Sequence, residues 1–189
     1  MIYLKTDEEV ELMRRSNDLL GRTLAEVAKV IRPGVTTAEL DKVAYEFICD
    51  NGGIPSCLGY EGYPATLCTS VNEQVVHGIP SDKVVLKDGD IVSVDTVVKL
   101  NGFCADSAYT FPVGEVAPEV LQLMRTTKEA LYLGIEQAVT GRRLGDIGAV
   151  IQQHCERAGY SVVREMVGHG IGRNLHEEPA VPVRRFHHL

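Results

Sequence analysis

Apolar residues near the N-terminus recur at the spacing of helices that bury one face. After a capping box formed by Thr6 and Glu9, this spacing joins Val10, Met13, Leu20, Leu24, Val27 and Ile31. Pro33-Gly34 ends the pattern. A second capping box, from Thr36 to Glu39, opens another apolar stripe, which ends at Asn51-Gly52-Gly53. The pattern therefore predicts two amphipathic helices.

A strand-like stretch spans Thr66 to Val71 in the first half of the chain. The second half has a similar order of elements, in which Pro118 suits the first turn of a helix running to about Val139. A further helix is expected from Leu144 to Arg157, followed by a strand from Tyr160 to Glu165. A weak internal repeat aligns Gly34 with Gly141. At the same shift, the position equivalent to Asp95 lies beyond Leu189. If the repeat is real, the second copy lacks a hairpin of its own.

Residues 91–111 have the pattern of a β-hairpin. Asn101-Gly102 supplies the positive φ angles of a type I′ turn, so Leu100 pairs with Phe103. In this register one face is apolar and is expected to join the core: Val92, Val94, Val98, Leu100, Phe103, Tyr109 and Phe111. The other face carries Asp95 and Asp106 as diagonal neighbours, roughly 7–8 Å apart at Cα. Two such carboxylates can hold one cation or two, whereas a lone aspartate more often points to water.

Composition and charge narrow the classes of function. The 189 residues are 44% hydrophobic and 24% charged, as is typical of one folded domain. A net charge of −7 gives no electrostatic reason to bind nucleic acid or an anionic membrane. No signal peptide or membrane span is recognisable, and the five cysteines form no Cys-x-x-Cys pair. We therefore expect a cytoplasmic protein with reduced thiols.

Three histidines are candidates for chemistry. His77 lies in a loop context from Asn72 to Pro80, and His169 is surrounded by glycines. His176 opens the stretch His-Glu-Glu-Pro, which is not the His-Glu-x-x-His zinc motif. Each histidine alone is more often a surface or hydrogen-bonded residue than a ligand. Cys57 and Cys68 fit no standard zinc spacing and are better interpreted as small apolar fillers.

Four blocks follow one another along the chain: Cys57-Leu58-Gly59-Tyr60 with Gly62-Tyr63-Pro64, then residues 72–80, then Val94-Asp95 through Asp106 to Phe111, and finally Gly168 to Gly172 with His176 to Pro179. Taken together, they resemble the type I methionine aminopeptidases of the pita-bread metallopeptidase fold. The resemblance implies an α+β fold with one catalytic domain over residues 1–189, in two pseudo-symmetric halves of helices and antiparallel strands. The halves would be about 1–115 and 116–189, the second incomplete.

The resemblance also implies roles for individual residues. Asp95, Asp106 and His169 would be ligands of two divalent ions of Co, Mn, Fe or Zn. His77 and His176 would be catalytic residues in contact with the substrate. The pocket for the methionine side chain would be lined by Cys57, Tyr60, Tyr63 and Cys68. The implied reaction removes the initiator methionine from nascent polypeptides whose next residue is small, and its implied partners are nascent N-termini near the ribosome.

The sequence departs from the family in its last quarter. Two glutamates that complete the family's metal site are absent, so we expect poor metal retention. The basic tail from Val183 to Leu189 does not continue the family pattern and resembles a frameshift, a premature stop or a fragment boundary. Val97 stands where the family usually has glycine and is expected to crowd the metal face.

Three hypotheses follow. The chain is a methionine aminopeptidase, or another pita-bread hydrolase such as a proline-specific peptidase, or a catalytically inactive remnant or binding module of the same fold. Metal stoichiometry separates the last hypothesis from the first. Peptide preference separates the first from the second.

Overall fold

The computed structural model describes residues 1–183, so the tail beyond Val183 lies outside the described residues. The chain forms two units. The larger unit comprises Tyr3–Val116 and Ile171–Leu175. The smaller unit comprises Met1–Ile2, Ala117–Gly170 and the residues from His176 onward.

Both predicted N-terminal helices are present in the larger unit. Helix α1 spans Asp7–Val30 and helix α2 spans Thr37–Asp50. Each begins with a reciprocal capping box, in which a threonine hydroxyl accepts the N–H of the glutamate three residues later. The N···O distances are 3.3 Å at Glu9 and 3.2 Å at Glu39. The capping boxes in the sequence therefore located both helix starts correctly.

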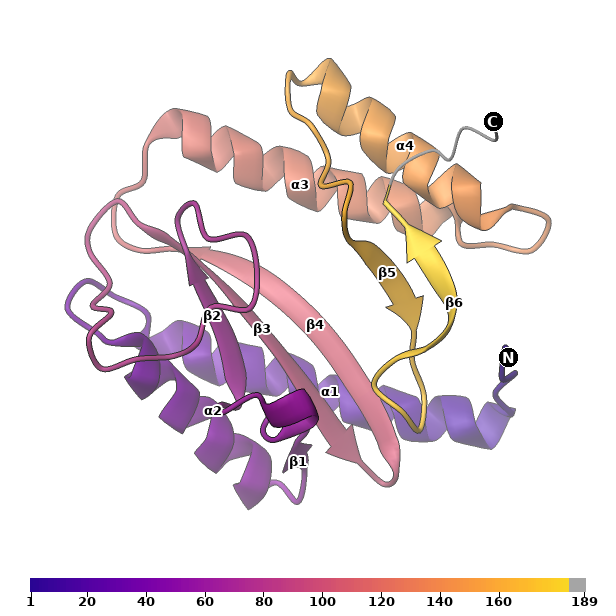
Figure 1. Cartoon of the computed structure of the whole chain (residues 1–189), viewed down its shortest axis with the longest axis horizontal. Coiled ribbons are helices and arrows are strands. Elements are labelled where there is room, and N and C mark those ends of the chain that lie inside the picture. The colour runs from indigo at the N-terminus through magenta and orange to yellow at the C-terminus, as the bar shows by residue number, and fades with distance from the viewer. Residues whose placement is uncertain (184–189) are drawn as a thin grey trace. The chain divides into compact units, whose positions relative to one another are not determined.

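One antiparallel sheet completes the larger unit (Figure 1). Its strands are β1 (Ile54–Pro55), β2 (Leu67–Val71), β3 (Ile91–Leu100) and β4 (Phe103–Pro112), and a short 3₁₀ turn, η1, spans Tyr60–Gly62. Strand β3 pairs with β4 along one edge and with β1 and β2 along the other. Asn101 and Gly102 have φ angles of 52° and 83°, and Leu100 pairs with Phe103. The predicted turn and register are both confirmed.

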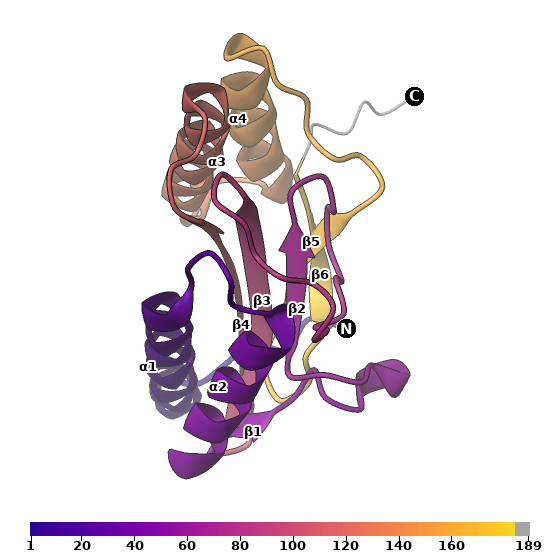
Figure 2. The same cartoon turned by 90° about the vertical axis from the view of Figure 1, so that its left-hand side faces the viewer.

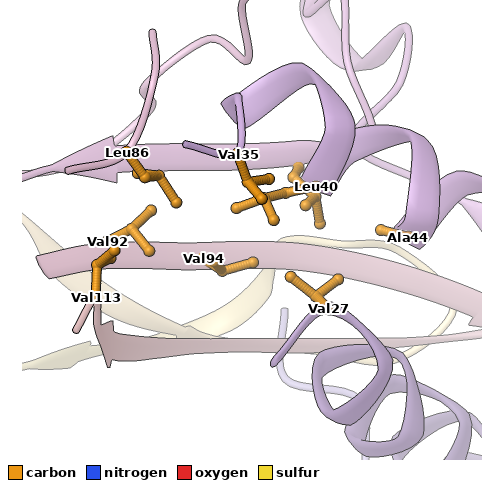
Figure 3. Packing of buried hydrophobic residues seen from close by; sticks show 9 residues of the cluster. Val27, Val35, Leu40, Ala44, Leu86, Val92, Val94 and Val113 are labelled. Atoms are coloured by element: carbon orange, nitrogen blue, oxygen red, sulfur yellow. The ribbon is translucent and has the colours of Figure 1, made fainter. Parts of the chain in front are cut away.

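The core of the larger unit lies between the sheet and helices α1 and α2, which cover one face of the sheet (Figure 2). Figure 3 shows how side chains from α1, α2 and β3 meet there. The cluster consists of Val27, Val35, Leu40, Ala44, Leu67, Leu86, Val92, Val94 and Val113. The prediction that Tyr109 is a core residue is wrong, because its side chain is 44% exposed. Strand β4 is paired only with β3 among the described residues, which leaves its side chains fewer neighbours.

The smaller unit contains helices α3 (Pro118–Gln137) and α4 (Leu144–Arg157), and a two-stranded ribbon of β5 (Val167–Gly170) and β6 (Glu177–Pro182). Both helices match their predictions, and Pro118 occupies the first turn of α3. The strand predicted from Tyr160 to Glu165 is wrong, because the ladder with β6 begins only at Val167. Strand propensity is realised only where a partner strand is available. No helix in residues 1–183 has the length and apolar character needed to cross a membrane.

Candidate functional site

The two aspartates of the β3–β4 hairpin lie on one face of the sheet. Asp95 pairs with Ala108, and Asp106 pairs with Val97, which makes the aspartates the diagonal neighbours that the turn predicted. Both side chains are half-buried. On the same face, the hydroxyls of Ser93 and Thr110 are hydrogen-bonded at 2.7 Å. The polar stripe therefore lies opposite the apolar face that the helices cover.

Two cysteines border the aspartates. Cys68 on β2 pairs directly with Asp95. Burial raises the pKa of the Cys57 thiol to about 12, and the negative charges of Asp95 and Asp106 add to this shift. Burial also raises the pKa of Cys68, and both aspartates act in the same direction. Both thiols are therefore neutral near pH 7, as the interpretation of apolar fillers requires.

Tyrosines from the loop before β2 lie nearby. Tyr63 donates a hydrogen bond from its hydroxyl to the carbonyl oxygens of Leu67 at 2.9 Å and Gly78 at 3.1 Å. Burial, followed by a hydrogen bond with the Cys68 thiol, raises the pKa of this phenol. Tyr60 begins the 3₁₀ turn and is 39% exposed. Tyr63 thus touches the cysteine beside Asp95, whereas Tyr60 stands at the surface.

His77 is exposed and adopts a left-handed backbone conformation with φ of 57°. A residue with a side chain rarely adopts this conformation unless its surroundings impose it. The next residue, Gly78, is buried, and a Cβ atom there would overlap the backbone carbonyl of Thr69. The loop position predicted for His77 is confirmed.

His169 and His176 belong to the smaller unit, on β5 and immediately before β6. Their ring centroids lie 4.3 Å apart in an edge arrangement. His169 Nδ1 lies 2.9 Å from the carbonyl oxygen of Gly170. Because a carbonyl only accepts, Nδ1 carries the proton, and Nε2 of the neutral ring carries the lone pair. Histidines bind metals through either ring nitrogen, and in this tautomer the coordinating atom would be Nε2.

The glycines around His169 serve the β5–β6 ribbon. A Cβ atom at Gly170 would lie 2.5 Å from the carbonyl oxygen of Glu178. At Gly168, a Cβ atom would lie 3.2 Å from the carbonyl oxygen of Val181. The close approach that the glycines predicted is therefore an approach of the neighbouring strand.

Asp41 of α2 belongs to no motif in the sequence analysis. Its carboxylate accepts the backbone N–H groups of Thr66 at 2.9 Å and Leu67 at 2.7 Å. Burial raises its pKa, and these two hydrogen bonds partly offset the shift. Asp41 therefore fixes the start of β2, the strand that carries Cys68. Its signal is a contact between distant segments, which no local motif reports.

The donor set suits a divalent cation in part. The aspartates provide oxygen ligands on one face, and the tautomer of His169 leaves Nε2 able to coordinate. No group of three or more His, Cys, Asp or Glu side chains in residues 1–183 has a metal-holding arrangement. The aspartates belong to the larger unit and His169 to the smaller one, so their joint coordination of a metal stays a prediction. Val97, expected to crowd this face, is only 4% exposed.

Comparison with known proteins adds sequence and fold evidence. The methionine aminopeptidase of Clostridium acetobutylicum is 50% identical over 182 residues, which cover 96% of this chain and 73% of that protein. The crystal structure of methionine aminopeptidase from Rickettsia prowazekii superposes with a TM-score of 0.96 at 40% identity, covering 98% of this chain and 75% of that one. Prolidase from Pyrococcus furiosus matches with a TM-score of 0.84 at 20% identity, covering 95% and 52% of the two chains. This last likeness shows the fold alone.

The fold is the α+β pita-bread fold, and the protein is a hydrolase of the aminopeptidase class. Residues 11–188 match the model of metallopeptidase family M24. The chain therefore belongs to family M24, and it spans about three quarters of the length of the two methionine aminopeptidases described above. Membership of this family implies divalent metal ions.

Proposed function

We propose that this chain removes the N-terminal methionine from polypeptides whose second residue is small, in a hydrolysis that depends on divalent metal ions. The observation that carries the proposal is the pair Asp95 and Asp106, diagonal on one face of a hairpin and bordered by two neutral thiols. Sequence identity of 50% to a methionine aminopeptidase supports the choice of substrate.

The residues divide into metal ligands and substrate contacts. Asp95 and Asp106, with His169, would hold the ions, of which Co, Mn, Fe and Zn suit carboxylate and imidazole ligands about equally. When bound, such ions polarise a peptide carbonyl and activate water. His77 and His176 would orient the substrate through hydrogen bonds to the scissile peptide group.

The thiols and tyrosines fit a pocket for a methionine side chain. A thioether packs favourably against aromatic edges and other sulfur groups. Because burial raises the pKa of Cys57 to about 12, the pocket wall presents neutral thiol there rather than a second anion. Tyr63 contributes a ring whose hydroxyl is already bonded to carbonyl oxygens. Such a wall favours an uncharged, polarisable side chain.

The deciding experiment is metal-dependent cleavage of a Met-Ala-Ser peptide by the purified chain, with Asp106→Asn beside it. We expect cleavage by the wild type and at least a hundredfold loss in the variant, since the variant keeps the shape but removes the charge. If neither the wild type nor the variant cleaves the peptide with Mn, Co, Fe or Zn, the chain is better explained as an inactive remnant. Equal activity of both proteins would reveal a contaminating host enzyme.

Peptide preference tests the substrate class. Preference for a peptide with proline in the second position and no requirement for methionine would indicate a proline-specific hydrolase instead. The proposal also includes a cytoplasmic site of action on nascent chains near the ribosome, with which the five free cysteines are consistent.

A further inference from the structure

We infer that the hydroxyl groups of Ser70 and Tyr63 are positioning groups for His77, which they hold through the peptide unit of Gly78. The inference rests on the proposed function, because it assigns His77 a task at the substrate. It concerns residues of the larger unit only. Ser70 has no role in any of the motifs that the sequence analysis selected.

The peptide groups of Gly78 are fixed on both sides. Its carbonyl oxygen accepts the N–H of Thr69 at 2.7 Å and the hydroxyl of Tyr63 at 3.1 Å. Its N–H donates to the hydroxyl oxygen of Ser70 at 3.2 Å. Ser70 is 3% exposed, so water does not readily replace this acceptor. The glycine is therefore bound to the edge of β2 that faces away from β3.

This attachment explains the backbone of His77. A left-handed conformation is strained for a non-glycine residue and persists only where the surrounding structure imposes it. The far end of the same loop is also fixed, because Asn72 exchanges hydrogen bonds with Ile91 through its N–H and its Oδ1, each at 3.0 Å. Between these two anchors, His77 is exposed. The loop thus presents an imidazole from a fixed backbone.

The attachment also connects His77 to the aspartate face. The hydroxyl of Tyr63 also donates to the carbonyl oxygen of Leu67 at 2.9 Å, and the next residue, Cys68, pairs with Asp95 across the strands. Tyr63 therefore connects the strand that carries Cys68 to the residue after His77. A misplacement of about 1 Å in a catalytic group can lower a rate about a hundredfold. Holding one loop peptide is therefore enough to matter for turnover.

The test is a double-mutant cycle with Met-Ala-Ser as substrate. Ser70→Ala and Tyr63→Phe should each lower kcat about tenfold, with KM changed less than about twofold, because each loosens the imidazole and leaves the pocket walls in place. In a His77→Ala background, Ser70→Ala should have almost no further effect. An equal loss from Ser70→Ala in both backgrounds would show that the hydroxyl does not act through His77.

Ser16→Ala is the matched control. Ser16 is fully buried, and its hydroxyl donates to carbonyl oxygens of Leu100 at 3.0 Å and Phe103 at 3.1 Å. The same chemical change there should lower stability and leave kcat within about twofold. A tenfold loss of kcat in this control would attribute the effect of Ser70→Ala to general destabilisation, which would overturn the inference.

Two readouts do not need activity, so they separate this inference from the proposed function. Ser70→Ala and Tyr63→Phe should accelerate hydrogen exchange at the Thr69 amide about tenfold beyond any change in global stability, because that amide bonds to Gly78. The NMR signal of the His77 imidazole should shift in both variants and not in Ser16→Ala. A silent wild type would refute the proposed function, and an unchanged His77 signal would refute the positioning role.

Discussion

The two units bury very different kinds of side chain. In the larger unit, Leu20, Leu40 and Phe103 are each at most 1% exposed. In the described part of the smaller unit, the buried aliphatic side chains are those of Ala130 and Pro182, and no larger one is buried. Helix α3 buries the small residues Thr126, Ala130 and Gly134 against its surroundings. One unit is thus held by large aliphatic and aromatic groups, and the other by close contact of small ones.

The difference indicates where the stability of the chain resides. Burial of a large aliphatic side chain contributes about 1.5–3 kcal/mol, whereas alanine and glycine contribute far less. Gly134 permits close packing of α3 on α4, since a Cβ atom there would lie 2.9 Å from Cδ1 of Ile151. Large apolar residues of α3, such as Leu131 and Ile135, are 57% and 55% exposed. The larger unit should therefore dominate the free energy of unfolding.

The largest expected effect comes from the same substitution made in each unit. Leu40→Ala should cost about 2–5 kcal/mol, because it leaves a cavity in the core cluster of the larger unit. Leu131→Ala on exposed α3 should cost less than about 0.5 kcal/mol. Urea unfolding followed by circular dichroism measures both, since the chain has no tryptophan. Similar losses in the free energy of unfolding would contradict the conclusion that the larger unit dominates stability.

Replacing a buried, unpaired hydroxyl in the larger unit is expected to increase the stability of the protein. Thr69 Oγ1 is buried without a hydrogen-bond partner within residues 1–183. Thr69→Val removes this unpaired group and should stabilise the protein by about 1 kcal/mol. Thr96→Val is the control, because Thr96 Oγ1 donates to the Thr66 carbonyl at 2.9 Å, and its loss should cost about 1 kcal/mol. Thermal unfolding should move the two variants in opposite directions.

The first turns of the helices also differ between the units, because the cap of α1 is complete and that of α4 is not. At α4, Asp146 Oδ2 accepts the N–H of Arg143 at 2.9 Å, but an arginine side chain has no acceptor to complete the box. Arg143→Ser should therefore stabilise the smaller unit by about 1 kcal/mol, whereas Thr6→Ala should destabilise α1 by a similar amount. Hydrogen exchange at the first-turn amides of each helix reports both changes. No gain from Arg143→Ser would mean that α4 is not limited by its cap.

The smallest expected effect is a pH dependence of the α2 cap. The N–H of Thr36, and then its hydroxyl, hold the pKa of Glu39 below its ordinary value of 4.5. Because the unfolded chain takes up the proton first, this stabilisation is present above pH 4.5 and is lost as the pH falls through the lowered pKa. The urea midpoint should fall less on acidification in Glu39→Gln. Glu46→Gln, on the same helix, should behave like the wild type.

The sequence located elements whose signals are local. Capping boxes fixed α1 and α2, and Asn101-Gly102 fixed the register that places Asp95 and Asp106 on one face. Tertiary neighbours decided the rest. The strand expected near Tyr160 begins instead at Val167, where β6 offers a partner. Asp41 on α2 accepts backbone N–H groups at the start of β2, and Ser70 on β2 accepts the N–H of Gly78 in the loop that follows. Both contacts depend on how the chain folds back on itself, so no spacing in the sequence revealed them.

The two-residue turn also decides which changes of length the hairpin tolerates. Pairing is counted outward from Leu100 and Phe103, so an extra residue inside the turn lengthens a surface loop and leaves both aspartates where they are. An extra residue between Phe103 and Asp106 inverts the facing of everything beyond it, unless a bulge absorbs the change. Insertions and deletions between the turn and either aspartate are therefore more damaging in homologous sequences than most substitutions. The number of residues between each aspartate and the turn is itself under selection.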